Sequence, residues 1–111
     1  MRRLLDYIEQ NLADDLSMPV LAGQANLSEN YLSEVFRDHT GLTPQLYITR
    51  KRIARAKELL QTGNYTVGEV AHLTGFFDQS HLDRHFRQFC GVPPSAWLPR
   101  DRLGCRSQAI A

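Results

Sequence analysis

The amino-acid sequence predicts an all-α protein in which two helix-turn-helix subdomains are joined by a long central helix. Three observations carry this prediction. Residues 66–97 contain the start, turn and stop signals of two short consecutive helices, and residues 17–47 contain a similar set. Between these segments lies a long helical pattern. We therefore expect about seven helices in the chain and no strands.

The second segment shows how its two helices begin and where the first ends. Thr66 and Glu69 have the T-x-x-E spacing of a capping box, in which two backbone amides are satisfied reciprocally. Gly75 stands where a left-handed residue would end this helix, since glycine adopts that conformation cheaply. Asp78 or Ser80 then caps the second helix. Two short helices joined by a tight turn describe a helix-turn-helix, whose second helix can enter a DNA major groove. We call this second helix the recognition helix.

The recognition helix of residues 79–89 carries one apolar stripe. Leu82, Phe86 and Phe89 recur at i, i+4 and i+7, so all three are expected to face the core. The helix stops at Gly91, before a double proline.

The first segment repeats this pattern. Ala22 and Asn26 precede Ala71 and Gly75 by 49 residues. Later matches are separated by 50 residues: Leu32, Phe36, Arg37, Gly41, Pro44 and Tyr47 correspond to Leu82, Phe86, Arg87, Gly91, Pro94 and Trp97. The change from 49 to 50 places one extra residue in the second turn, near Phe77. Two copies are too few for a stacked solenoid, so a tandem pair of helix-turn-helix motifs is favoured.

The first half follows from helix start signals and periodicity. A helix is expected over residues 2–13, broken by Asp14-Asp15. Ser17 caps the next helix, and Ser28 caps the first recognition helix. The expected inward residues are Leu4, Leu5, Ile8, Leu12, Val20, Leu21, Ala22, Leu32, Val35 and Phe36.

A long helix is expected from about Thr43 to Gly63. Its inward side is expected to carry Leu46, Ile53, Ala56 and Leu60, widened by Ile48 and Leu59. At ~1.5 Å per residue such a helix spans roughly 27 Å. That length is comparable with the ~34 Å between successive turns of a major groove. The connector would thus hold two recognition helices on one face of the duplex.

The expected organisation has four parts. The first helix-turn-helix subdomain takes residues 1–49, the linker helix 43–63, the second subdomain 64–99, and a flexible tail 100–111. With 42% hydrophobic residues the chain can bury a core.

Several classes are disfavoured by composition and spacing. The apolar runs are too short for a membrane span, and the charged N-terminus is no signal peptide. Two cysteines without CxxC spacing indicate a reduced, cytoplasmic compartment. No paired carboxylates, phosphate loop or Ser-His-Asp ordering appears, so we expect no enzyme and no cofactor. His81 and His85 have a spacing that can bind zinc, yet HExxH is absent, and we expect no metal.

Charge is distributed unevenly although the net charge is only +1. Residues 1–49 carry three arginines against seven acidic residues, a net −4, whereas residues 50–111 carry ten basic against five acidic residues, a net +5. Solvated helix faces could differ in charge without function. Beside the helix-turn-helix pattern, the asymmetry indicates that the second half contributes more of the attraction to phosphates.

The residues opposite each apolar stripe are the candidate DNA contacts. In the second recognition helix these are Gln79, Ser80, His81, Asp83, Arg84 and Arg87; in the first they are Asn30, Ser33, Glu34 and Arg37. Arg84 can pair bidentately with guanine and Gln79 with adenine, while Asp83 can accept from cytosine N4 or orient Arg84. The alternative is that these polar side chains are merely solvated.

The chain resembles the DNA-binding domain of the AraC/XylS family of bacterial transcription regulators. The carrying residues are Ala22, the run from Leu27 to Phe36, Thr40-Gly41, Pro44, the helix YITRKRIARAKELL and the segment GFFDQSHLDRHFRQFCGVPP. The resemblance covers roughly residues 4–99. It implies specific binding of double-stranded DNA and regulation of transcription, and we expect activation through contact with RNA polymerase. Most members attach this domain to an effector-binding or dimerisation domain, which these residues do not include. The competing class is a helical protein-interaction module that does not bind DNA.

Overall fold

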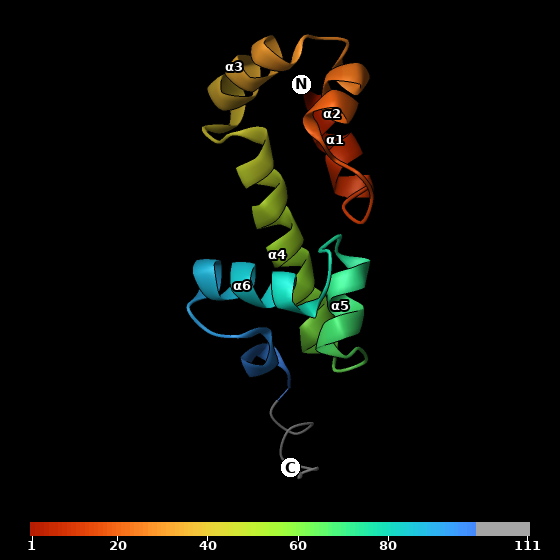
Figure 1. The fold of residues 1–111 in the computed structure, drawn as a ribbon, viewed down its shortest axis with the longest axis vertical. Helices are drawn as coiled ribbons and strands as arrows, with labels where there is room; N and C mark the ends of the chain where they lie inside the picture. The colour runs from red at the N-terminus through yellow and green to blue at the C-terminus, as the bar shows by residue number, and fades with distance from the viewer. Residues whose placement is uncertain (100–111) are drawn as a thin grey trace. The chain divides into compact units, whose positions relative to one another are not determined.

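The structure, a computed structural model, describes residues 1–99, which form six α-helices and one 3₁₀ helix without any strand (Figure 1). The elements are α1 (Arg2–Gln10), α2 (Met18–Ala25), α3 (Glu29–Thr40), α4 (Pro44–Thr62), α5 (Val67–Leu73), α6 (Gln79–Cys90) and the 3₁₀ helix η1 (Pro94–Trp97). The predicted all-α class and long central helix are confirmed. The predicted tail, with Cys105, lies outside the described residues.

The chain divides into two compact units, Met1–Lys51 and Arg52–Ala111. We call them unit 1 and unit 2. Each has its own hydrophobic core and its own helix-turn-helix, α2–α3 in unit 1 and α5–α6 in unit 2. The helix α4 contributes residues to both cores.

In unit 1, α1 ends earlier than the predicted residue 13. The side-chain amide of Asn11 donates to the carbonyl of Tyr7 at 2.7 Å and takes up a free acceptor at the helix end. The chain has left the helix before Asp14-Asp15. Leu4 and Ile8 are buried as predicted, whereas Leu5 and Leu12 pack at the edge of the core.

The turn between α2 and α3 depends on Asn26. This residue has φ 58° and ψ 44° and is the single non-glycine residue of positive φ in residues 1–99. Asparagine tolerates that conformation better than most side chains do. The Ser28 hydroxyl accepts a hydrogen bond from the amide of Tyr31 at 3.2 Å and caps α3, as predicted. Ser17 stands at the start of α2, but its side chain makes no capping bond.

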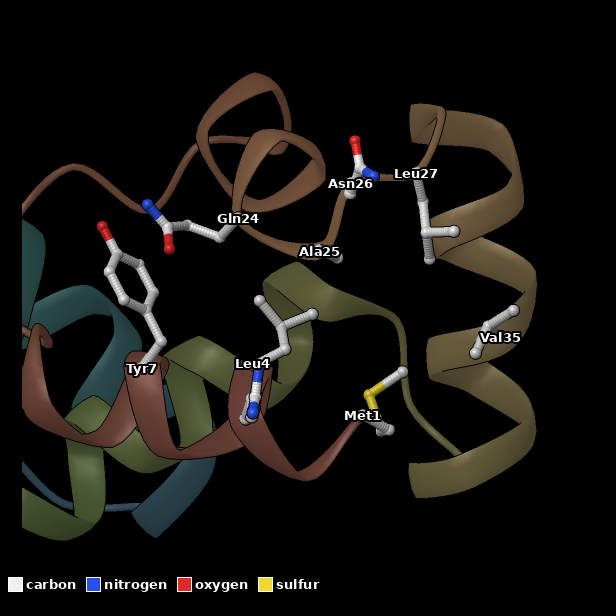
Figure 2. A pocket seen from close by; sticks show the side chains of 9 residues that line it. Met1, Leu4, Tyr7, Gln24, Ala25, Asn26, Leu27 and Val35 are labelled. Atoms are coloured by element: carbon white, nitrogen blue, oxygen red, sulfur yellow. The ribbon is translucent and has the colours of Figure 1, made fainter.

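A pocket of about 500 Å³ lies beside this turn (Figure 2). Apolar side chains from three helices line it, together with the polar side chains of Arg3, Tyr7, Gln24 and Asn26. Figure 2 shows Leu4 of α1, and Met1 just before that helix, on the opposite side of the pocket from Val35 of α3. Asn26, the residue with the left-handed conformation, therefore also lines this pocket.

In unit 2 the capping box is present with both of its bonds. The Thr66 amide donates to the Glu69 carboxylate at 2.8 Å, and the Glu69 amide donates to the Thr66 hydroxyl at 3.1 Å. Gly75 follows α5 with φ 88°, the left-handed conformation that the sequence predicts. Thr74, just before it, is fully buried and donates its hydroxyl proton to the Val70 carbonyl at 2.7 Å.

The two turns close with the same backbone bond. Leu27 donates to the carbonyl of Ala22, and Phe76 donates to the carbonyl of Ala71, each at 3.0 Å. Gly41 and Gly91 end the two recognition helices with φ 77° and 78°. The repeat found in the sequence is thus a repeat of backbone conformation.

The prediction that Phe89 faces the core is wrong. Leu82 and Phe86 are fully buried, but Phe89 is 37% exposed. The chain after Gly91 folds back, and Val92 and Trp97 pack against the unit 2 core together with Cys90. This covers the side of the last turn that bears Cys90 and leaves the ring of Phe89 outside.

Along α4 the predicted stripe is correct at one end only. Ile53, Ala56 and Leu60 are buried in unit 2, but Leu46 is 39% exposed and Ile48 takes the core position in unit 1. One continuous stripe does not run the length of α4 because its two ends serve different cores.

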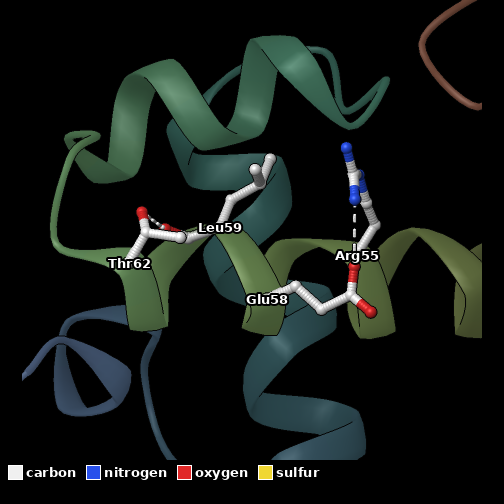
Figure 3. A network of polar contacts seen from close by, with 4 residues as sticks. All are labelled: Arg55, Glu58, Leu59 and Thr62. Atoms are coloured by element: carbon white, nitrogen blue, oxygen red, sulfur yellow. Dashed lines mark hydrogen bonds and ion pairs between the residues drawn. The ribbon is translucent and has the colours of Figure 1, made fainter.

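The exposed side of α4 in unit 2 is held by local bonds (Figure 3). Arg55 forms an ion pair with Glu58 at 3.0 Å, one turn along the helix. At the end of the helix the Thr62 hydroxyl donates to the Leu59 carbonyl at 2.7 Å. It also accepts from the amide of Asn64 at 3.2 Å. These bonds satisfy groups that a helix end leaves without partners.

Candidate nucleic-acid interface

The start of α6 presents a polar surface that its cap holds in place. The Asp78 carboxylate accepts from the His81 amide at 2.8 Å, so Asp78 and not Ser80 is the cap. The first residues of the helix, Gln79 and Ser80, are exposed, and so is Arg84 one turn later. In a helix-turn-helix the N-terminal residues of the second helix reach base edges.

The two arginines of α6 differ in their ion pairing. Arg87 donates from Nε to Oδ2 of Asp83 at 2.8 Å, an i, i+4 ion pair on the helix surface. Asp83 therefore orients Arg87, and the alternative that it orients Arg84 is not what the structure shows. Arg84 is exposed and makes no ion pair within residues 1–99. Its guanidinium is available for a bidentate contact, as guanine recognition requires.

A histidine pair lies behind this surface. Nδ1 of His81 accepts a hydrogen bond from the Phe77 amide at 3.2 Å, and the Nε2 atoms of His81 and His85 are 3.1 Å apart. Because Nδ1 accepts, a neutral His81 carries its proton on Nε2 and donates it to His85. His85 then keeps its own proton on Nδ1, an atom that is buried without a hydrogen-bond partner.

The environment of His85 disfavours its charged form. Burial lowers the pKa of His85 from its ordinary value of 6.5, and the neighbouring His81 and Arg84 lower it further. The ring also packs against Phe76, with centroids 5.8 Å apart. His85 is thus a neutral packing residue at the base of the polar surface.

The pair has a chemistry that suits hydrogen bonding better than metal binding. A metal on Nε2 of His81 would require a proton on Nδ1, where the Phe77 amide already donates. Across residues 1–99, no three His, Cys, Asp or Glu side chains gather in a way that would hold a metal ion.

In unit 1 the corresponding surface belongs to α3. Asn30, Glu34 and Arg37 are exposed, and Ser33 is half-buried. Tyr31, which the sequence reasoning did not single out, is 55% exposed on the first turn of α3. Most of the predicted residues of both recognition helices are therefore exposed, whereas Ser33, His81 and Asp83 are half-buried.

Sequence reasoning also missed Phe77 as a surface residue. Its side chain is 89% exposed, immediately before the cap of α6. The one-residue change in repeat spacing pointed to this position without saying where the ring would go.

No helix within the described part of the chain combines the length and the apolar composition that crossing a bilayer demands.

Comparison with known proteins gives consistent matches. Residues 21–100 match a family described as a helix-turn-helix domain. The chain is 34% identical over 101 residues to the HTH-type transcriptional activator RhaS of Salmonella schwarzengrund. The matched stretch covers 91% of this chain and 34% of the relative. It therefore spans about a third of the length of the curated relatives it matches.

Two solved structures are similar over nearly all of the chain. The DNA-binding domain of AdpA, in complex with a target DNA, superposes with a TM-score of 0.84 at 28% identity, covering 98% of this chain and 95% of that one. The C-terminal domain of the two-component response regulator yesN from Fusobacterium nucleatum has the same TM-score and identity, with 88% and 96% covered.

Proposed function

The chain belongs to the AraC/XylS family of DNA-binding transcription regulators, and from this premise we propose that each of its two recognition helices reads a segment of major groove in one asymmetric DNA site. The bases would be read by the start of each helix. The proposed contacts are Asn30, Ser33, Glu34 and Arg37 on α3, and Gln79, Ser80, His81, Asp83, Arg84 and Arg87 on α6.

The observation that carries this proposal is the exposed start of α6. Asp78 caps the helix, Phe86 anchors it in the core, and Arg84 projects without an ion-pair partner in residues 1–99. The helix is held in place by its cap and its core contact, so the backbone from which Arg84 projects needs no reordering when the side chain binds. The AdpA domain, which has the same fold, was solved on a target DNA, and this supports a DNA partner.

The two helices are proposed to contribute unequally. The first carries Glu29, Glu34 and Asp38 beside Arg37, so its surface attracts phosphate weakly. The second has Arg84 and Arg87 with one compensating carboxylate. We expect α6 to dominate affinity and α3 to add selectivity.

We further propose that the regulation is activation in the cytoplasm, through contact with RNA polymerase. The support is the similarity to RhaS, which is named a transcriptional activator. Because the chain spans about a third of that relative, an effector-binding or dimerisation domain is proposed to act with it in the whole regulator. The family is not a class of enzymes, and we propose no catalysis.

The test is selection of bound duplexes from a random pool with the purified chain, followed by sequencing. The expected result is one asymmetric site with two informative patches. Scrambling the patch read by α6 should abolish binding, and scrambling the other should weaken it less. Failure to enrich any sequence would refute specific recognition.

A matched control separates the two helices. Arg84→Ala and Glu34→Ala each remove the exposed charged side chain at the same position of the repeat, from α6 and from α3. Selection with each variant should relax one patch and leave the other intact. A site that must be a palindrome bound by two chains would contradict reading by a single chain.

A further inference from the structure

We propose that Phe77 is an apolar reader of sequence, whose ring contacts the 5-methyl group of a thymine in the major groove beside the start of α6. The inference rests on the proposed function, since it adds one contact to the same interface. It predicts a preference for thymine at one base pair, in addition to those that the polar residues of α6 are proposed to read.

The first step is that Phe77 has no counterpart in unit 1. In the hydrogen bonds that close the two turns, the donors Leu27 and Phe76 are 49 residues apart, and so are their acceptors. The helix caps, Ser28 and Asp78, are 50 residues apart. Phe77 is the one residue between these two registers, so it is the insertion. The turn of unit 1 closes with the same bond without it.

The second step is that the fold gains no burial from this ring. Phe77 is 89% exposed, whereas the adjacent Phe76 is 5% exposed and belongs to the core of unit 2. An aromatic ring that stays in water forgoes the stabilisation that burial would supply. A large apolar side chain in that position offers its surface to a partner.

The third step is that the backbone of Phe77 is held firmly. Its amide donates to Nδ1 of His81 at 3.2 Å, and the next residue, Asp78, caps the helix. Phe76, on its other side, packs edge to face on the ring of His81, with centroids 5.5 Å apart. A ring on a fixed backbone loses little conformational freedom on binding.

The fourth step identifies the partner chemistry. Phe77 lies two residues before Gln79, at the end of α6 that enters the groove in a helix-turn-helix. The apolar group that a major groove presents is the thymine methyl, and phenylalanine is among the side chains that contact it. Phosphate oxygens offer a phenyl ring no comparable partner.

The test uses a duplex selected by the wild-type chain from a random pool. Each thymine of the patch read by α6 is replaced in turn by deoxyuridine, which lacks only the methyl group. Wild-type affinity should fall about four-fold at one thymine, the ratio that corresponds to roughly 0.8 kcal/mol for one buried carbon group. Phe77→Ala should lose about the same factor on the unmodified duplex and nothing further on that deoxyuridine duplex.

The control is Leu73→Ala, which removes another exposed apolar side chain, 45% exposed on α5, and should leave affinity and the deoxyuridine effect unchanged. Equal losses for Phe77→Ala on both duplexes, or no loss on either, would overturn the assignment while leaving DNA binding intact. A wild-type chain that selects no duplex would instead overturn the proposed function. If Phe77→Ala failed to fold, the deoxyuridine series with wild-type protein would still test the contact. No loss of affinity at any substituted thymine would refute it.

Discussion

Phe86 meets Trp97 edge to face, with ring centroids 5.9 Å apart and planes inclined by 69°. Fifty residues earlier, Phe36 meets Tyr47 in the same way, at 5.2 Å and 79°. Both phenylalanines are fully buried. Each unit therefore anchors its recognition helix with the same aromatic pair, although the partner in unit 1 lies on α4 and the partner in unit 2 lies on η1.

Truncation of either phenylalanine should destabilise its own unit strongly. Phe86→Ala and Phe36→Ala should each lower the free energy of unfolding by ~3–5 kcal/mol, because each leaves a cavity and removes an aromatic contact. Urea unfolding followed by circular dichroism would measure this. Phe89→Ala, on the same helix but partly exposed, should cost less than about 1 kcal/mol. An equal cost for Phe89 and Phe86 would contradict the packing described.

Replacing a glycine by alanine should have opposite effects at the left-handed end of α6 and in the interior of α2. Gly91 has φ 78° and no neighbour within 4 Å of an added Cβ, so Gly91→Ala should cost ~1–2 kcal/mol through backbone strain alone. Gly23 lies inside α2 with equally open space. Gly23→Ala should therefore stabilise unit 1 by ~0.5–1 kcal/mol. Thermal unfolding of the two variants would show shifts of opposite sign. Shifts of the same sign would contradict the backbone conformations.

The two arginines of α6 should differ in what they contribute to DNA binding. Arg84→Ala should cost ~1–3 kcal/mol and relax the preference at one base pair, since its guanidinium is exposed and unpaired within residues 1–99. Arg87→Ala should weaken all sequences alike and reduce the slope of log affinity against log salt by about 1.

Competition binding on selected and substituted duplexes at several salt concentrations would separate these behaviours. Asp83→Asn is the matched control, because it removes the carboxylate that holds Arg87 but keeps the arginine. A loss for Arg84→Ala that is equal on every duplex would make Arg84 a phosphate contact.

The histidine pair predicts that acid destabilises unit 2. The pKa of His85 is lowered in the folded state from its ordinary value of 6.5, so the unfolded chain takes up this proton first. Stability from His85 is therefore complete above about pH 6.5 and is lost as the pH falls from there through the lowered pKa. The physical cause is that burial leaves a charged His85 with less water than it has in the unfolded chain, and that its charge would lie beside His81 and Arg84.

Urea unfolding at pH 7.5 and at pH 5.5 would test this. His85→Gln should reduce the difference in unfolding free energy between the two conditions. His39→Gln, which replaces an exposed histidine of α3 in unit 1, is the control for removing an imidazole outside unit 2. A His85→Gln variant with the full wild-type difference would refute the role of His85.

Local signals were read correctly from the sequence because their partners lie within a few residues. Thr66 and Glu69 form the predicted capping box, and Asn26 takes the predicted left-handed turn. The buried positions Phe36 and Phe86 followed from helical periodicity and from the repeat. The candidate DNA contacts remain predictions that the mutants above would test.

The errors arose where tertiary contacts decide between positions that periodicity treats alike. Leu46 and Phe89 share a helical stripe with core residues, yet more than a third of each residue's surface is exposed. Asp83 pairs with Arg87 and not with Arg84, as i, i+4 spacing on a helix favours. The bond from the Phe77 amide to His81 depends on how the turn folds back, which spacing alone does not reveal.

Trp97 is the chain's one tryptophan, and it packs against the core of unit 2, edge to face with Phe86 and with the ammonium group of Lys57 5.0 Å from its ring centroid. Three of the four tyrosines, Tyr7, Tyr31 and Tyr47, lie in unit 1. The molecule therefore carries a built-in spectroscopic label for each half. Emission excited selectively from the indole follows the loosening of unit 2 alone, whereas tyrosine emission follows mainly unit 1, so the two halves can be watched separately as they melt.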